Sequence, residues 1–202
     1  MVKVGYPDYY RQIVIDVTRS DIRSLSPLGY TQKKFYYLHA VKDVLSQERS
    51  YGRVTTTYHL APPDTYTWYR WDTDEWFEAE ILVKTAIMGI VVVNFGPYLK
   101  VSASGEQMSI RPRLMFYIND DLWFELEGSV NSWTETDWTL KKSVGAVGLT
   151  EEKVLEEGDV LKVRLSFDYY TTVSGSEADL YFGQDTYSDE NLILLPVRII
   201  TK

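Results

Sequence analysis

The clearest strand pattern in this chain is Val160-Leu161-Lys162-Val163-Arg164-Leu165-Ser166-Phe167-Asp168-Tyr169-Tyr170, which follows the turn Glu157-Gly158-Asp159. Successive side chains of an extended strand point to opposite faces of a sheet. Leu161, Val163, Leu165 and Phe167 therefore share one face, and Val160, Lys162, Arg164 and Ser166 share the other. This alternation predicts a half-buried antiparallel strand, and Ala178 to Gly183 and Leu192 to Ile200 predict two more.

Strand patterns recur along the rest of the chain, with turn residues between them. They are Gln12 to Thr18, Lys33 to Val41, Val54 to Leu60, Thr65 to Trp71, Trp76 to Val83, Ile87 to Phe95, Tyr98 to Ala103, Met108 to Ile118 and Leu122 to Val130. We expect turns at Asp72-Thr73-Asp74 and Asn119-Asp120, and a hairpin across Ser104-Gly105-Glu106. Ile87 to Phe95 is apolar on both faces, which predicts a central strand.

Helix signals are sparse. Thr150 to Glu157 predicts a short helix, because Thr150 suits an N-cap and acidic residues follow it. Asp43 to Gly52 fits either a short helical turn or a loop. Strands and helices do not alternate, which excludes a doubly wound parallel sheet. The expected fold is an all-β, antiparallel β-sandwich, jelly-roll-like, with at most one or two short helices.

The composition fits one domain, residues 1–202, with 45% hydrophobic residues to build its core. The chain has no cysteine, which excludes disulfides, thiolate metal sites and thiol nucleophiles. Its net charge of −8 disfavours a nucleic-acid partner. The N-terminus does not match a signal peptide, and the apolar run Ala86 to Val93 is too short to cross a membrane. We therefore expect neither a nucleic-acid nor a membrane partner.

Aromatic residues are unusually abundant, with 16 tyrosines and 6 tryptophans. Such side chains suit β-strands and are also enriched at protein interfaces. Trp76-Phe77-Glu78-Ala79-Glu80 and Trp123-Phe124-Glu125-Leu126-Glu127 share the pattern W-F-E-x-E. This echo predicts two equivalent strands, one in each sheet of the sandwich.

Pairs of carboxylates are the main candidates for catalysis. Glu78, Glu80, Glu125 and Glu127 could serve a glycoside hydrolase if two of them faced each other across a cleft. The simpler interpretation is that they occupy the wet face of their strands. The acidic turns fit no EF-hand loop, and no nucleotide or nucleophile motif is present. We predict no catalytic residue, no metal and no cofactor.

The C-terminal quarter resembles the end of jelly-roll β-sandwiches. The resemblance rests on Glu157-Gly158-Asp159 with its strand, on Ala178-Asp179-Leu180-Tyr181-Phe182-Gly183, and on Leu192-Ile193-Leu194-Leu195-Pro196. Similar endings occur in surface proteins of tailed phages and archaeal viruses, in carbohydrate-binding modules and in tumour-necrosis-factor-like domains. The resemblance implies a virion structural protein (capsid, decoration or tail component). The composition also has a thermophilic character.

We therefore expect a non-enzymatic protein of the virion that assembles as a homo-oligomer and with other virion proteins. Its expected contact residues are Tyr6, Tyr9 and Tyr10 on an N-terminal arm (residues 1–11), and Trp133 and Trp138 on an exposed loop. The arm could equally form a strand of its own sheet. The alternative function is a carbohydrate-binding module, with a glycan stacked on Trp68, Trp71, Trp76, Trp123, Trp133 or Trp138; a jelly-roll glycoside hydrolase comes third.

Overall fold

A computed structural model describes residues 31–36, 43–44, 52–53, 56–184 and 191–200. The predicted arm with Tyr6, Tyr9 and Tyr10 and the predicted strand Gln12 to Thr18 lie outside these residues. The described residues form 15 strands and no helix. The strands are β1 (Thr31–Tyr36), β2 (Asp43–Val44), β3 (Gly52–Arg53), β4 (Tyr58–Leu60), β5 (Tyr69–Glu80), β6 (Thr85–Phe95), β7 (Pro97–Val101), β8 (Met108–Ile118), β9 (Asp121–Glu127), β10 (Asn131–Trp133), β11 (Thr139–Leu140), β12 (Ser143–Leu155), β13 (Val160–Tyr170), β14 (Ala178–Gln184) and β15 (Leu192–Ile199).

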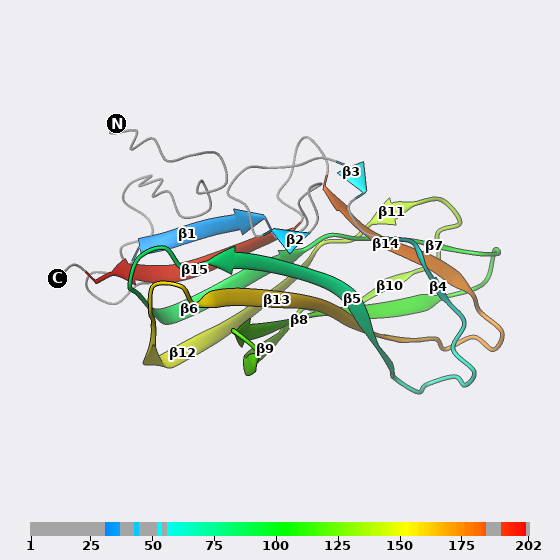
Figure 1. The fold of residues 1–202 in the computed structure, drawn as a ribbon. Helices are drawn as coiled ribbons and strands as arrows, with labels where there is room; N and C mark the ends of the chain where they lie inside the picture. The colour runs from blue at the N-terminus through cyan, green and yellow to red at the C-terminus, as the bar shows by residue number, and fades with distance from the viewer. Residues whose placement is uncertain (1–30, 37–42, 45–51, 54–55, 185–190, 201–202) are drawn as a thin grey trace.

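One layer of the fold is a six-stranded sheet in the order β10-β8-β13-β5-β2. The sixth strand, β9, also pairs with β8, where it lies next to residues 113–118, whereas β10 lies next to residues 108–110. The strand pairs are antiparallel except for the short pair β2–β5. The strand with the clearest sequence pattern, β13, lies between β8 and β5 near the middle of this sheet (Figure 1).

The second layer consists of a four-stranded sheet, β1-β15-β6-β12, and a five-stranded sheet, β11-β7-β14-β3 with β4 also on β14. The backbone passes directly from one of these sheets to the other at two places. Only Gly96 separates β6 from β7, and only two residues separate β11 from β12. Asn191 ties the junction together: its Oδ1 accepts a hydrogen bond from the Gly96 amide at 3.0 Å, and its Nδ2 donates to the Gly183 carbonyl. The molecule is therefore an antiparallel β-sandwich, as predicted.

The core lies between the two layers and draws on both. Its largest fully buried side chains are Trp133, Phe77, Phe95, Phe116, Phe167, Phe182, Leu60, Ile87 and Leu99. In β13, Leu161, Val163 and Leu165 face this core, and Lys162 and Arg164 face outward. The alternation predicted for this strand is confirmed.

The predicted turn at Asp72-Thr73-Asp74 is wrong, because β5 runs without a break through these residues. The register against β13 shifts here, so that Trp76 lies opposite Arg164 and Asp72 lies opposite Ser166. Such a shift is a β-bulge, which leaves extra residues on one strand and increases its twist. The polar residues Asp72, Thr73 and Asp74, which suggested a turn, therefore lie at this bulge.

The helix predicted for Thr150 to Glu157 is also wrong. Residues up to Leu155 belong to β12, and Lys153 to Leu155 pair with Ile87 to Thr85 of β6. Pairing with a buried neighbouring strand outweighs the local helix signal, as tertiary context commonly does. The residues that follow form the turn before β13.

Two predictions about strand partners are wrong. The segments flanking Ser104-Gly105-Glu106 do not form a hairpin: β7 pairs with β14 and β11, and β8 pairs with β13, β9 and β10. The two W-F-E-x-E segments, in β5 and β9, lie in one sheet rather than one in each. The turn at Asn119-Asp120 is confirmed, since it joins β8 to β9 as a hairpin.

Candidate functional site

The outer face of the six-stranded sheet carries a network of ion pairs at its centre. Asp168 of β13 is 6% exposed, and its Oδ2 accepts hydrogen bonds from Arg111 at 2.6 Å and from Arg113 at 2.7 Å. The Nη1 of Arg113 also donates to Glu125 at 2.7 Å, and its Nη2 lies 2.7 Å from Glu127. Two strands, β8 and β9, and the buried Asp168 are thus joined across the sheet.

These contacts shift the pKa of Arg113. Burial alone would lower it, but the hydrogen bonds to Asp168 and Glu125 outweigh burial and raise the pKa above its ordinary value. The Nε of Arg113 is buried and has no hydrogen-bond partner within the described part of the chain. The network therefore holds its charges firmly and leaves one buried donor unpaired.

The two glutamates that open the acidic pairs considered for glycoside hydrolysis, Glu78 and Glu125, do not face each other. Glu78 lies on β5 and Glu125 on β9, with β13 and β8 between them. Three strand spacings separate them by roughly 14 Å, whereas the two carboxylates of such enzymes lie roughly 5–9.5 Å apart. Glu125 is moreover held by Arg70 and Arg113. This pair does not fit the geometry of that reaction.

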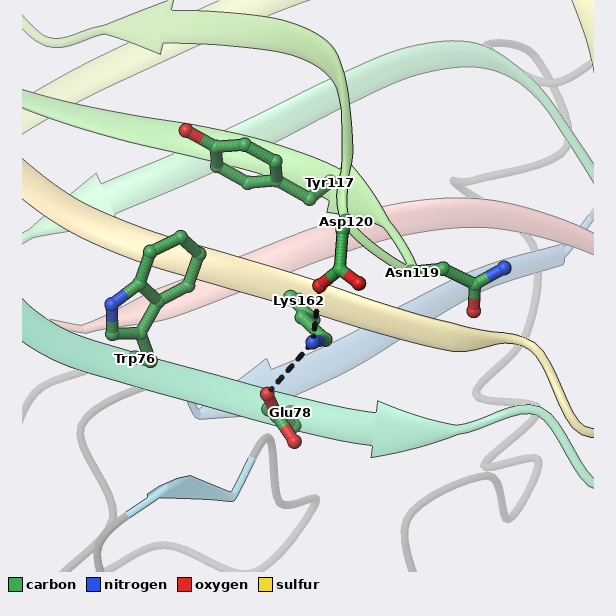
Figure 2. A pocket seen from close by; sticks show the side chains of 6 residues that line it. All are labelled: Trp76, Glu78, Tyr117, Asn119, Asp120 and Lys162. Carbon is green, nitrogen blue, oxygen red and sulfur yellow. Dashed lines mark hydrogen bonds and ion pairs between the residues drawn. The ribbon is translucent and has the colours of Figure 1, made fainter.

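A pocket of about 450 Å³ lies on the same face, beyond the ion-pair network. We call it the Trp76 pocket, and it is lined by Trp76, Glu78, Tyr117, Asn119, Asp120 and Lys162 (Figure 2). The side chains come from β5, β8, β13 and the turn between β8 and β9. Sequence reasoning identified Trp76 and Glu78 but missed Tyr117, Asp120 and Lys162, whose alignment depends on the register of three strands.

Two aromatic rings form one side of the Trp76 pocket. The ring centroids of Trp76 and Tyr117 lie 5.1 Å apart, with their planes inclined by 55°. The guanidinium of Arg164 lies over the Trp76 ring, 5.3 Å from its centroid, and its Nε donates to the Thr73 carbonyl at 2.7 Å. The Thr73 carbonyl thus holds Arg164 in place, and the cation–π contact with Arg164 holds the indole of Trp76.

Charged side chains form the other side of the pocket. The Nζ of Lys162 donates to Oδ1 of Asp120 at 2.9 Å and lies 3.6 Å from Oε1 of Glu78 (Figure 2). The hydrogen bond to Asp120 and the nearby charge of Glu78 raise the pKa of Lys162. The side chain of Asp120 is 94% exposed, so most of its oxygen surface faces solvent.

The turn that carries Asp120 is held from the neighbouring turn. Asn119 has a positive φ of 55°, and its Oδ1 accepts a hydrogen bond from the Val160 amide at 2.9 Å. Its Nδ2 donates to Asp159 at 3.1 Å, and Asp159 also accepts from the Glu156 amide at 2.8 Å. The Asn119 contact and the Glu156 amide hold the pKa of Asp159 below its ordinary value. Asp120 is therefore presented from a fixed turn.

The structure separates the two tryptophans expected on an exposed loop. Trp133 is 0% exposed and donates from Nε1 to the Thr139 carbonyl at 2.8 Å, so its predicted place at the surface is wrong. Burying the large ring while pairing its N–H explains this position. Trp138 is half-buried, stacks edge-on against Tyr181 and lies beneath Lys100.

The remaining tryptophans do not form a single row with these. Trp68 packs on Tyr170 with centroids 4.3 Å apart and lies beneath Arg111. Trp71 contacts Tyr58 and Phe167. Trp123 packs partly buried against Phe124. Of the six, Trp76 is the one that lines the pocket.

The outer face of the four-stranded sheet differs sharply from the charged face. We call one row of exposed and half-buried positions on it the apolar strip, which consists of Ile90, Val92, Val144, Ala146 and Gly148. Ala146 lies opposite Val92, and Gly148 lies opposite Ile90, on β12 and β6. Val144 is 53% exposed and Ile90 39% exposed. No charged side chain interrupts these five positions.

No helix among the described residues is long and apolar enough to cross a membrane. No group of three or more histidine, aspartate or glutamate side chains among them could hold a metal ion.

Comparisons with known proteins place the chain in no family. No family model matches it, and no curated protein matches it. Among solved structures it is similar to a CocE/NonD family hydrolase from Staphylococcus aureus (8% identity, 85% of this chain and 37% of that one, TM-score 0.45). An aminopeptidase from a marine sediment Thaumarchaeota archaeon (7% identity, 87% and 38%, TM-score 0.47) is also similar. The Eiger TNF of S. frugiperda shows 15% identity over 72% of this chain and 94% of that one, with a TM-score of 0.32. The chain spans less than two-fifths of the length of the hydrolase and the aminopeptidase.

Proposed function

We propose that this chain is a non-enzymatic structural protein of a virus particle, a capsid, decoration or tail component, that assembles with further copies of itself. The observation that carries the proposal is the apolar strip, in which exposed Val144 and Ile90 flank the pair Ala146–Val92 and no charged side chain lies between them. Contiguous exposed apolar surface of this kind marks protein contacts. The resemblance of the C-terminal quarter to virion sandwiches supports the same function.

The position of the strip suits a second copy as its occupant. It extends onto β12, which ends the four-stranded sheet within the described part of the chain. A symmetric pair of molecules brings the same surface patch of each copy together, so an uncharged strip meets an uncharged strip. Towards its end, β12 carries Glu151, Glu152 and Lys153, and charges on an edge strand oppose unlimited edge-to-edge pairing. Contact through the strip would therefore give a closed assembly.

Light scattering coupled to size-exclusion chromatography over a range of protein concentrations tests the proposal. We expect a discrete oligomer, visible as a ring or closed shell by electron microscopy. Val144→Lys should lower the mass, because it places a charge in the strip. Leu122→Lys is the matched control, since Leu122 is 52% exposed but lies on β9 in the other sheet. A monomer at every concentration, or equal effects of the two variants, would refute the proposal.

A further inference from the structure

We propose that the Trp76 pocket is a binding site for neutral glycans. This site lies on the six-stranded sheet, whereas the apolar strip lies on the four-stranded sheet, so the two proposals concern different surfaces. Its volume of about 450 Å³ falls within the ordinary range for small-molecule sites. The proposal rests on the rings, the polar atoms and the charge of the pocket.

The rings offer an apolar surface with polar tips. A sugar ring has C–H faces that pack on aromatic rings and hydroxyls around its rim. The indole N–H of Trp76 makes no hydrogen bond within the described part of the chain, and the hydroxyl of Tyr117 has only a weak contact with the Met115 sulfur at 3.8 Å. Aromatic side chains with unsatisfied polar tips suit a ligand that is apolar on one face and hydroxylated at its edge.

The charged side chains of the pocket supply both kinds of hydrogen-bonding group. The carboxylates of Glu78 and Asp120 accept hydrogen bonds, and the ammonium of Lys162 donates them. Both carboxylates converge on Lys162, as Figure 2 shows, so their free oxygen lone pairs lie close together. Neighbouring hydroxyls of a sugar, each both donor and acceptor, match this alternation of acceptors and donor.

The charge of the site selects against anionic glycans. Lys162, the cation among the lining residues, is already paired with two carboxylates. Glu80 and Asp121 are exposed nearby on β5 and β9, and the whole chain carries a net charge of −8. An anionic sugar would meet these like charges, and the nearby cation Arg164 is already engaged by the Trp76 ring and the Thr73 carbonyl. The ligand class that fits is therefore an uncharged oligosaccharide.

The site is also ordered in advance. Arg164 holds the Trp76 ring, and the Asn119–Asp159 hydrogen bond holds the turn that carries Asp120. Binding to a preformed site costs less conformational entropy than binding that must order loose side chains. A glycan would find the rings and the carboxylate already in position.

Isothermal titration calorimetry on the full chain tests the inference. The probes are cellotetraose, mannotetraose and xylotetraose, chosen after a screen on an array of neutral and anionic glycans, with tetragalacturonate as the anionic probe. We expect a neutral probe to bind, and Trp76→Ala to raise its Kd about tenfold or more. Trp138→Ala is the matched control, because it removes another half-buried tryptophan outside the pocket, and it should leave Kd unchanged.

A second variant guards against misfolding of Trp76→Ala. Glu78→Gln keeps the shape of the side chain but removes its charge, and we expect it to raise Kd while leaving the melting temperature of the protein nearly unchanged. The inference is overturned if no neutral glycan on the array binds, if tetragalacturonate binds more tightly than the neutral probes, or if neither variant alters Kd. Cleavage of the bound probe, detected by mass spectrometry, would also overturn it in favour of a hydrolase.

Discussion

Oδ2 of Asp168 lies 2.7 Å from Nη2 of Arg113, and both side chains are at least nine-tenths buried. A buried ion pair contributes little net stability as a pair, but removing one partner leaves the other charge buried and uncompensated. Here the cost is compounded because Arg111 shares the same carboxylate oxygen.

We therefore expect Asp168→Asn to lower the free energy of unfolding by about 3–5 kcal/mol. Glu152→Gln is the control: Glu152 pairs with Arg198 at 2.6 Å, but both side chains are about a third exposed. Surface pairs are worth about 0–1 kcal/mol, so this variant should cost no more than that. Urea denaturation monitored by circular dichroism measures both, and equal losses would contradict the burial argument.

Gly145 of β12 lies directly against β9. A Cβ atom at this position would collide with Leu126 Cδ2 and with the Glu127 carbonyl. Gly145→Ala should therefore destabilise the protein by about 1–3 kcal/mol, as overpacking commonly does. Gly148, three residues further along the same strand, has nothing within 4 Å of its added Cβ. Gly148→Ala should be neutral or slightly stabilising in thermal melts, and a similar loss in both variants would refute the predicted contact.

Asp159 should make part of the stability depend on pH. Its folded-state pKa lies below its ordinary value because Asn119 and the Glu156 amide donate to the carboxylate. A depressed pKa stabilises the folded state above the ordinary aspartate pKa of about 3.9, and this contribution is lost as pH falls through the folded-state pKa.

The test is the melting temperature from pH 7 down to pH 3 for wild type and Asp159→Asn. The wild type should be the more stable at pH 7, and the difference should shrink below pH of about 4. Asp121→Asn is the control on the adjacent hairpin, because no side-chain hydrogen bond of Asp121 occurs within the described residues. A difference between wild type and Asp159→Asn that stayed constant with pH would contradict the assignment.

The sequence predicted the class of fold because alternation is a local signal. Lys162 and Leu161 are neighbours in the chain, and their opposite faces follow from strand geometry alone. The Asn119-Asp120 turn was predictable for the same reason, since the signal and the structure lie in the same few residues. The core-facing and outward-facing sides of β13 needed no knowledge of its neighbours.

Features that depend on distant partners were not predictable in this way. Asp72-Thr73-Asp74 has turn chemistry, and only its pairing with Ser166 makes it a bulge. Trp133 has polar neighbours in the sequence. Its ring is nevertheless buried in the core, and its N–H donates to the Thr139 carbonyl. The pocket likewise requires Trp76, Tyr117 and Lys162 to meet on three strands. The register that aligns them depends on how these strands pair, and no single segment of the sequence predicts it.

The passage of β6 into β7 through Gly96 has a mechanical consequence. A load applied to the five-stranded sheet is carried along an unbroken backbone into the four-stranded sheet, and Asn191 fastens the same point to the neighbouring chain path at Gly183. The two halves of the layer should then open together rather than in succession, so that their amides exchange with solvent as one cooperative group. Such a layer resists being peeled apart at its middle.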